Sequence, residues 1–121
     1  MRSLLIVDPC EQTRLVLTPL LREQGYELQF IPDSKAALAL LWEKAFGIIL
    51  VDMTDPAAGG ESLLQALNGI DPDRSQKRAA FIRSGDEALR ERLLGLGCDA
   101  VLEKPINFHD LTMALSDLAG V

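Results

Sequence analysis

Short apolar runs alternate with longer amphipathic stretches along the whole chain. The apolar runs lie at about 3–8, 27–31, 47–52, 79–84 and 99–103, and the amphipathic stretches at about 11–24, 34–45, 60–68, 86–95 and 108–119. Short apolar runs are typical of buried strands, whereas an apolar stripe at helical spacing is typical of a surface helix. Five strands that alternate with five helices predict an α/β domain with a parallel sheet.

The polarity of the strands predicts their order in the sheet. Residues 4–7 (LLIV) and 48–51 (IILV) are continuously apolar, as expected for central strands covered on both faces. Residues 26–31 (YELQFI) alternate between polar and apolar side chains, which suits an edge strand. The first and third strands are therefore predicted to be neighbours, with the second outside the first. The expected fold class is α/β, with a doubly wound (flavodoxin-like) five-stranded parallel sheet of order 2-1-3-4-5 and five helices.

Polar and helix-breaking residues predict further local features. Asn107 can cap the last helix. Pro19 falls within the first helix and predicts either a kink or a helix that begins near Thr18. Residues 69–78 (GIDPDRSQKR) predict a polar surface loop before the fourth strand. Trp42 is expected to pack at the border of the second helix.

Length and charge narrow the class of protein. The chain has 121 residues, enough for one compact domain, and we expect residues 1–121 to form a single domain with no output domain. The net charge of −6 and the pI of about 4.7 disfavour binding to a phosphate backbone, which needs clustered Lys and Arg. No apolar stretch approaches the ~20 residues of a membrane span, and residues 1–7 are too short for a signal peptide. These features predict a soluble cytoplasmic protein whose partners are proteins or cations.

The cysteine and histidine pattern argues against a structural zinc site. Cys10 and Cys98 lie far apart, no CxxC pair occurs, and the single histidine is His109. Two reduced thiols are therefore expected.

Four polar residues stand where apolar runs end. Asp8 follows LLIV, Asp52 follows IILV, Ser84 follows AFIR, and Lys104 precedes Pro105. A charge at the end of a buried strand is costly unless it is paired or binds a metal. Ligands of doubly wound sheets bind beyond the carboxyl ends of the strands, where the strand order reverses. The four residues therefore predict one convergent polar site.

These four side chains together suit phosphoryl chemistry. A carboxylate can act as a nucleophile toward phosphorus and form an acyl phosphate. The developing negative charge needs a divalent cation and a fixed ammonium group, and magnesium prefers hard oxygen ligands. Asp52 can be the nucleophile, and Asp8 can help to hold magnesium. Lys104 supplies the counter-charge, and Ser84 offers a hydroxyl to the new phosphoryl oxygens. Each residue also has a simpler interpretation: a helix cap for Asp8, a loop or turn residue for Asp52 and Ser84, and a solvated side chain for Lys104.

In their order and strand context, these residues resemble the receiver domain of bacterial response regulators in two-component signalling. The resemblance covers nearly the whole chain and rests on LLIVDP at 4–9, IILVDMTDPAAGG at 48–60, FIRSGD at 81–86, GLGCDAVLEKPI at 95–106 and a closing amphipathic helix. The more specific signals are the Lys104-Pro105 pair and, in the third loop, Asp52 with Pro56.

The resemblance implies a phosphorelay function in which the chain is a phosphoacceptor rather than an enzyme. Asp52 would accept a phosphoryl group from the phosphohistidine of a histidine kinase, in a transfer that the receiver itself catalyses. Magnesium would be held by Asp8, Asp52 and the backbone carbonyl of Thr54. The side chain of Thr54 would influence loss of the phosphoryl group.

The same resemblance implies a switch and a set of partners. Ser84 matches the switch hydroxyl and Lys104 the family's lysine, and Pro105 would follow a cis peptide bond. The partners would be a histidine kinase or phosphotransfer protein and a downstream protein target, with no direct contact to nucleic acid or membrane. Phosphorylation would alter the face made by the fourth helix, fifth strand and fifth helix, and a homodimer through that face is left open.

The sequence departs from the family pattern at three places. Pro9 stands where the family has a second acid that contacts magnesium, so magnesium binding should be weakened unless Asp8, Glu11 or Asp55 supplies the missing oxygen. Val101 replaces an aromatic residue whose rotamer reports the state of the switch. The third loop also lacks the usual acid before its final glycine.

These departures keep two alternative functions open. The first is a pseudo-receiver, a protein-docking module that signals without phosphorylation because Pro9 replaces a magnesium-binding acid. The second is a small α/β enzyme or flavin binder, although the loops lack a Gly/Ser/Thr-rich phosphate cradle and no GxGxxG or GxxxxGK[ST] occurs.

Overall fold

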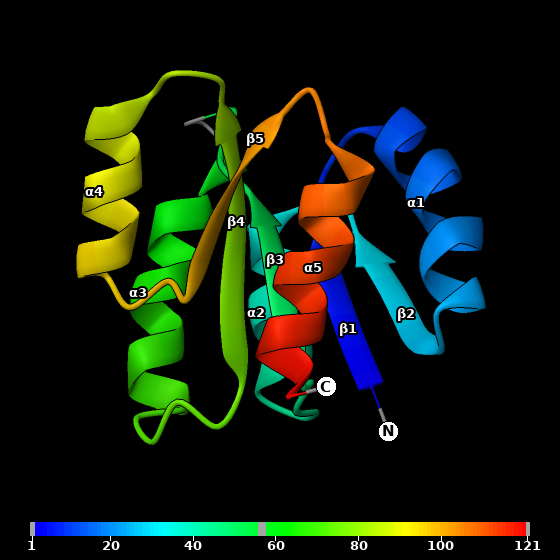
Figure 1. Cartoon of the computed structure of the whole chain (residues 1–121). Helices are drawn as coiled ribbons and strands as arrows, with labels where there is room; N and C mark the ends of the chain where they lie inside the picture. Colours follow the sequence, from blue (N-terminus) through cyan, green and yellow to red (C-terminus); the bar gives the residue numbers. More distant parts are fainter. Residues whose placement is uncertain (1, 56–57, 121) are drawn as a thin grey trace.

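The five apolar runs form one parallel sheet whose strands lie in the order β2-β1-β3-β4-β5 (Figure 1). The computed structural model describes residues 2–55 and 58–120. The strands are β1 (Arg2–Val7), β2 (Tyr26–Ile31), β3 (Ile48–Asp52), β4 (Lys77–Arg83) and β5 (Ala100–Lys104). The predicted fold class and strand order are thus confirmed. Pro56, part of the third-loop motif, lies outside the described residues.

Helices cover both faces of the sheet. They are α1 (Glu11–Glu23), α2 (Ser34–Leu41), α3 (Gly60–Ile70), α4 (Glu87–Gly95) and α5 (Phe108–Ala119). Helices α1 and α5 pack on one face, and α2, α3 and α4 pack on the other (Figure 1). No helix in the two described ranges is long and apolar enough to cross a membrane. Because the strands are parallel, their carboxyl ends all lie at one edge of the sheet, which is where such sheets bind ligands.

The central strands supply both hydrophobic layers. Successive side chains of a strand point to opposite faces, so Leu4 and Ile6 pack toward α1 and α5, whereas Leu5 and Val7 pack toward α2, α3 and α4. All residues of β3 are buried. Burying one such aliphatic side chain stabilises the fold by roughly 1.5–3 kcal/mol. This two-sided burial is the reason that residues 4–7 of β1 and 48–51 of β3 are continuously apolar.

The helix details that the sequence predicts have mixed outcomes. The side chain of Asn107 accepts a hydrogen bond from the Asp110 N–H at 3.0 Å, so the predicted cap of α5 is confirmed. Helix α1 begins at Glu11 and contains Pro19, so a start near Thr18 is wrong. Helix α2 ends at Leu41 rather than at residue 45. Trp42 caps α2 and is 70% exposed, so the expectation that it packs is also wrong.

The prediction of a surface loop over residues 69–78 is wrong in part, because this segment contains a buried charge. Strand β4 already begins at Lys77, and Arg78 is fully buried. The Arg78 guanidinium donates from Nη1 to the Gln76 carbonyl at 2.8 Å, and from Nη2 to the carbonyls of Leu67 at 3.1 Å and Asp71 at 3.2 Å. Its Nη1 also lies 3.5 Å from Asp71 Oδ2. The polar side chains of this segment therefore link the end of α3 to the start of β4 through hydrogen bonds.

Asp71 is the acidic partner in this network. Its carboxylate accepts hydrogen bonds from the Gln76 N–H at 2.8 Å and the Ser75 hydroxyl at 2.8 Å. Burial raises the pKa of Asp71, but these hydrogen bonds and the Arg78 charge outweigh burial, so the pKa lies below its ordinary value. The buried Arg78 thus faces an ionised carboxylate, as a buried charge requires.

The two cysteines are free, in line with the expected reduced thiols. Cys10 is exposed at the start of α1, whereas Cys98 is buried before β5. Burial raises the pKa of Cys98 to about 11. Its thiol therefore stays protonated near neutral pH and behaves as a small core side chain.

Candidate functional site

Three of the four predicted site residues meet at the carboxyl edge of the sheet. Lys104 Nζ, at the end of β5, lies 2.8 Å from Asp8 Oδ2 and 3.3 Å from Asp52 Oδ1. The side chains of Asp8 and Asp52 are 0% and 3% exposed, and that of Lys104 is 20% exposed. One ammonium group therefore bridges two buried carboxylates at the point where the strand order reverses.

The loop after β1 holds Asp8 in a fixed orientation. The Asp8 N–H donates to the Ile31 carbonyl at 3.0 Å, and Asp8 Oδ1 accepts from the Cys10 N–H at 2.9 Å. Cys10 is the N-cap residue of α1 and makes no side-chain capping bond. Asp8 therefore turns the chain into α1 with one oxygen and binds Lys104 with the other.

Asp52 is held from its own loop. The Thr54 hydroxyl lies 2.9 Å from Asp52 Oδ1 and 3.0 Å from Oδ2, and the Thr54 N–H donates to Oδ1 at 3.3 Å. Thr54 thus contacts the carboxylate directly.

Lys104 remains protonated in this environment. Burial lowers its pKa, but the hydrogen bond and charge of Asp8, together with Asp52, outweigh burial and raise the pKa above its ordinary value. The ammonium also lies 5.3 Å from the centre of the Phe81 ring. The site therefore carries a permanent positive charge beside Asp52. The peptide bond that follows, Lys104–Pro105, is cis.

Ser84 does not join this cluster. Its hydroxyl lies 3.4 Å from Glu103 Oε1 and is exposed. Glu103 Oε2 also accepts hydrogen bonds from the Gly85 N–H at 3.3 Å and from Arg90 Nη2 at 3.3 Å. Arg90 Nη1 donates in turn to the Val101 carbonyl at 3.0 Å. Glu103, which the sequence reasoning did not select, therefore fastens the loop that carries Ser84 to β5.

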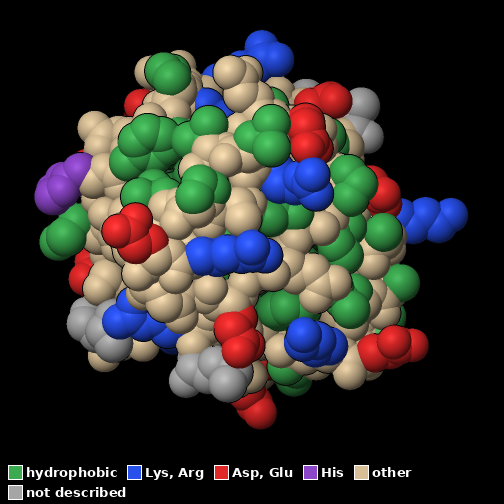
Figure 2. All heavy atoms as spheres, turned by 90° about the vertical axis from the view of Figure 1, so that its right-hand side faces the viewer, with side chains coloured by type: hydrophobic (Ala, Val, Ile, Leu, Met, Phe, Trp, Pro, Cys, Tyr) green, Lys and Arg blue, Asp and Glu red, His purple; other side chains and the backbone are tan. Residues whose placement is uncertain are grey.

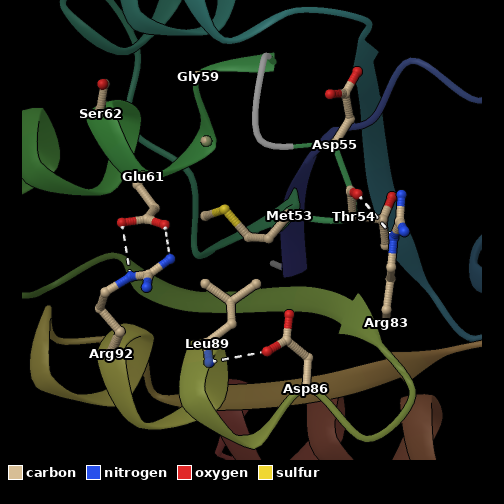
Figure 3. A pocket seen from close by; sticks show the side chains of 11 residues that line it. Met53, Thr54, Asp55, Gly59, Glu61, Ser62, Arg83, Asp86, Leu89 and Arg92 are labelled. Carbon is tan, nitrogen blue, oxygen red and sulfur yellow. Dashed lines mark hydrogen bonds and ion pairs between the residues drawn. The ribbon is translucent and has the colours of Figure 1, made fainter.

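Arg83 is a second residue that the sequence reasoning missed. Its Nε donates to the backbone carbonyl of Thr54 at 3.2 Å. The two residues line a cavity of about 330 Å³ together with Asp55, Asp86 and Arg92 (Figure 3). The signal in the sequence was a cation directly after a buried run, in FIRSGD at 81–86.

The far wall of this cavity is closed by an ion pair between two helices. Arg92 of α4 lies 2.7 Å from Glu61 of α3, and both side chains are visible opposite Arg83 in Figure 3. The pair is exposed to solvent, and such a pair is worth little in free energy. The pair engages the guanidinium of Arg92 with a carboxylate, whereas Arg83 and Lys104 are the cations that end β4 and β5.

The described residues fit a magnesium ion poorly. Pro9 offers no carboxylate, Asp8 is paired with Lys104, and the Thr54 carbonyl already accepts from Arg83. Within residues 2–55 and 58–120, no group of three His, Cys, Asp or Glu side chains is arranged to hold a metal. Magnesium needs several hard oxygen ligands, of which one or two are protein carboxylates. A metal would have to displace existing cationic partners to bind here.

Comparison with known proteins relates this geometry to one family. A family model described as the response regulator receiver domain matches residues 4–116. The chain is 29% identical over 122 residues to a "Probable chemotaxis protein CheY" of Rhizobium etli, covering 98% of this chain and 92% of that protein. It is 36% identical over 110 residues to the response regulator receiver protein Anae109_2439 of Anaeromyxobacter sp., covering 88% of this chain and 44% of that protein. It is also 29% identical over 120 residues to the sensor histidine kinase AruS of Pseudomonas aeruginosa, of which it spans 12%.

Solved structures match the fold over almost all of the chain. A response regulator structure from Chloroflexus aurantiacus has a TM-score of 0.89 at 20% identity and covers 99% of this chain and 98% of that one. The receiver domain of the sensor histidine kinase PA1611 from Pseudomonas aeruginosa, with a magnesium ion coordinated in its active site cleft, has a TM-score of 0.85 at 22% identity. It covers 99% of this chain and 98% of that one.

Proposed function

The chain belongs to the response regulator receiver domain family of two-component signalling, and we propose that it accepts a phosphoryl group on Asp52. The observation that carries this proposal is the position of the Lys104 ammonium, 3.3 Å from Asp52 and 2.8 Å from Asp8. A fixed positive charge beside a carboxylate stabilises the negative charge that develops on phosphoryl oxygens during transfer. We take residues 1–121 to act as one receiver unit.

The proposed reaction moves one phosphoryl group from a phosphorylated imidazole to a carboxylate. A carboxylate oxygen of Asp52 attacks phosphorus, the P–O bond of an acyl phosphate forms, and the P–N bond to the imidazole breaks. The imidazole leaves with the electron pair of that bond and takes up a proton. The Lys104 ammonium already lies between the two carboxylates, so it can bind the phosphoryl oxygens on Asp52 as they become more negative. The chain modifies itself, so this is phosphotransfer to a receiver and not turnover of a separate substrate.

The proposed donor is a histidine kinase or phosphotransfer protein, which must cover the edge of the sheet to reach Asp52. Beside the site, Cys10, Val16, Lys104 and Phe108 are among the residues that line a cavity of about 340 Å³. Val16 and Phe108 are 43% and 45% exposed. Figure 2 shows the α1 side of the molecule, where hydrophobic side chains lie among charged ones. A partly apolar surface next to the acceptor is suited to a protein donor.

We expect Pro9→Asp to strengthen magnesium binding at least about tenfold, since a second carboxylate beside Asp8 raises the negative charge of the ligand set. The measurement is a magnesium titration followed by the amide NMR shifts of Asp8, Asp52 and Thr54. Pro9→Ala is the matched control because it removes the proline without adding a carboxylate. Equal affinities of the two variants would rule out the missing acid as the cause of weak binding.

The proposed switch moves Ser84 from Glu103 toward the phosphoryl group on Asp52. Glu103 holds Ser84, Gly85 and Arg90 in the unmodified chain, so it opposes this movement. The output surface would be the α4-β5-α5 face, where Leu94 and Met113 are 50% and 53% exposed. A downstream protein or a second copy of the chain would bind there.

Glu103→Gln should therefore release the Ser84 loop without phosphorylation. Removing an exposed charged contact is worth up to about 1 kcal/mol, which is about a fivefold change in the balance between the two loop positions. The amide shifts of Ser84 and Gly85 in this variant should move toward their positions in the phosphorylated wild type. Glu91→Gln, on the exposed side of α4, is the control and should leave both shifts in place. The switch would have to be reassigned if the two variants behaved alike.

A pseudo-receiver is the second candidate, favoured by Pro9 and by the bond from Arg83 to the Thr54 carbonyl. In that case the fold would bind its partner in the same way whether or not a phosphodonor is present. Partner affinity measured with and without the small donor phosphoramidate separates the two functions, because only a phosphoacceptor would change affinity upon modification.

A further inference from the structure

Any phosphoryl group on Asp52 would need more positive charge than Lys104 alone supplies. By analogy with other phospho-residues, the acyl phosphate would carry about −1.5 to −2 charge at pH 7. This charge would replace the single negative charge of the Asp52 carboxylate, beside the buried carboxylate of Asp8. Lys104 contributes one positive charge, and it is shared between Asp8 and Asp52. The usual source of further charge is a divalent cation, for which the described residues are poorly arranged.

Arg83 lies where a second cation is needed. Strands β4 and β5 are paired in a register that sets Arg83 opposite Lys104, so the two cations end neighbouring strands. Arg83 Nε donates to the Thr54 carbonyl at 3.2 Å, and the Thr54 hydroxyl lies 2.9 Å from Asp52 Oδ1. The guanidinium, at the end of β4, therefore reaches Asp52 through one intervening residue, Thr54. Arg83 and Thr54 both line the cavity of about 330 Å³ (Figure 3).

The chemistry of arginine matches this position. A guanidinium stays protonated at all physiological pH values and binds phosphate oxygens through a planar fork of N–H donors. The bond to Thr54 uses Nε, which is one of several N–H groups of the side chain. Arg83 also donates to the Thr54 carbonyl, which the family resemblance assigns as a magnesium ligand. The same side chain therefore occupies that ligand and places a positive charge near it.

From these observations we propose that Arg83 takes the place of the divalent cation, binding the phosphoryl group on Asp52 and making phosphorylation independent of metal. This inference rests on the proposed phosphoacceptor function and adds the source of charge. Lys104 and Arg83 would then flank the phosphoryl group, with Thr54 positioned by Arg83.

The test measures the rate of phosphorylation by phosphoramidate in EDTA and in magnesium, using intact mass of the full chain. We expect the wild-type rates in the two buffers to agree within about twofold, and Arg83→Gln to lower the rate in EDTA about 100-fold, as when one donor to a developing oxyanion is removed. Arg83→Lys keeps the charge without the planar fork, so its rate in EDTA should lie between those of the wild type and Arg83→Gln. Arg22→Gln, which removes an exposed arginine of α1, should match the wild type.

Magnesium binding provides a readout besides the rate. Arg83→Gln frees the Thr54 carbonyl, so amide shifts at Asp52 and Thr54 should saturate at a magnesium concentration about tenfold lower than in the wild type. The rate of this variant should rise when magnesium is added.

The outcomes separate this inference from the function on which it rests. A wild-type chain that is modified only with magnesium, at a rate that Arg83→Gln leaves unchanged, overturns the role of Arg83 and preserves the phosphoacceptor function. A wild-type chain that is modified in neither buffer overturns both.

Discussion

Asp52→Asn should abolish phosphorylation of the chain. The carboxylate oxygen is the nucleophile of the proposed transfer, and a carboxamide is far less nucleophilic and forms no acyl phosphate. The substitution keeps the shape of the side chain, so the hydroxyl of Thr54 and the ammonium of Lys104 can still approach it. The expected result is no mass increase after incubation with phosphoramidate under conditions in which the wild type gains one acid-labile phosphoryl group.

Asp73→Asn is the matched control for this variant. Asp73 is exposed in the loop before β4, at the opposite end of the strands, and the substitution changes the net charge by the same amount. It should leave the rate and extent of modification unchanged. Equal incorporation by Asp52→Asn and the wild type would show that the acceptor lies elsewhere in the chain.

Of the substitutions proposed for this chain, Arg78→Met should cause the largest loss in the free energy of unfolding. Arg78 is fully buried, and its removal leaves Asp71 buried without its cation and takes one hydrogen bond each from the carbonyls of Leu67 and Gln76. Removing one partner of a buried ion pair costs about 3–5 kcal/mol in the free energy of unfolding. Methionine retains much of the volume of the arginine stem, so the loss reports the polar network more than a cavity. Urea unfolding followed by circular dichroism measures the change.

Two further variants define the cause of that loss. Arg22→Met, on the exposed face of α1, should change the free energy of unfolding by less than about 0.5 kcal/mol. The double variant Asp71→Asn/Arg78→Met should lose less than the sum of its single variants, because residues of one network are coupled. If the losses of the two single variants simply added up in the double variant, Asp71 and Arg78 would not stabilise each other.

The fold could be predicted because its strongest signals are local. The continuous runs at 4–7 and 48–51 and the alternating run at 26–31 depend only on which faces of each strand are covered. Together they place β1 beside β3, and this placement brings Asp8 and Asp52 to the same edge. Lys104 follows from its strand end and the adjacent Pro105. The convergence of these three charges therefore follows from topology.

The errors arose where a polar residue has a partner distant in sequence. Residues 69–78 have the composition of a surface loop, and only the end of α3 packed against β4 makes Arg78 a buried residue. The switch role predicted for Ser84 stays a prediction, since in the unmodified chain its hydroxyl follows β4 and lies beside Glu103 of the neighbouring strand. Arg83 was overlooked because a cation at the end of a buried run does not indicate its partner, which is a backbone carbonyl distant in sequence.

The metal prediction depends on loop contacts that the sequence shows only in part. The loss of an acid at Pro9 is visible in the sequence. The additional engagement of Asp8 by Lys104 and of the Thr54 carbonyl by Arg83 is visible only in three dimensions. Each contact adds a cation to a position where a metal would otherwise be attracted.

The most direct test of the central claim is to locate the phosphoryl group on the wild-type chain. Incubation with phosphoramidate, reduction of any acyl phosphate with borohydride and peptide mass spectrometry would identify the modified residue. The account predicts one modification per chain, found as homoserine in place of Asp52. Modification of another residue such as His109, or no modification at all, would contradict it.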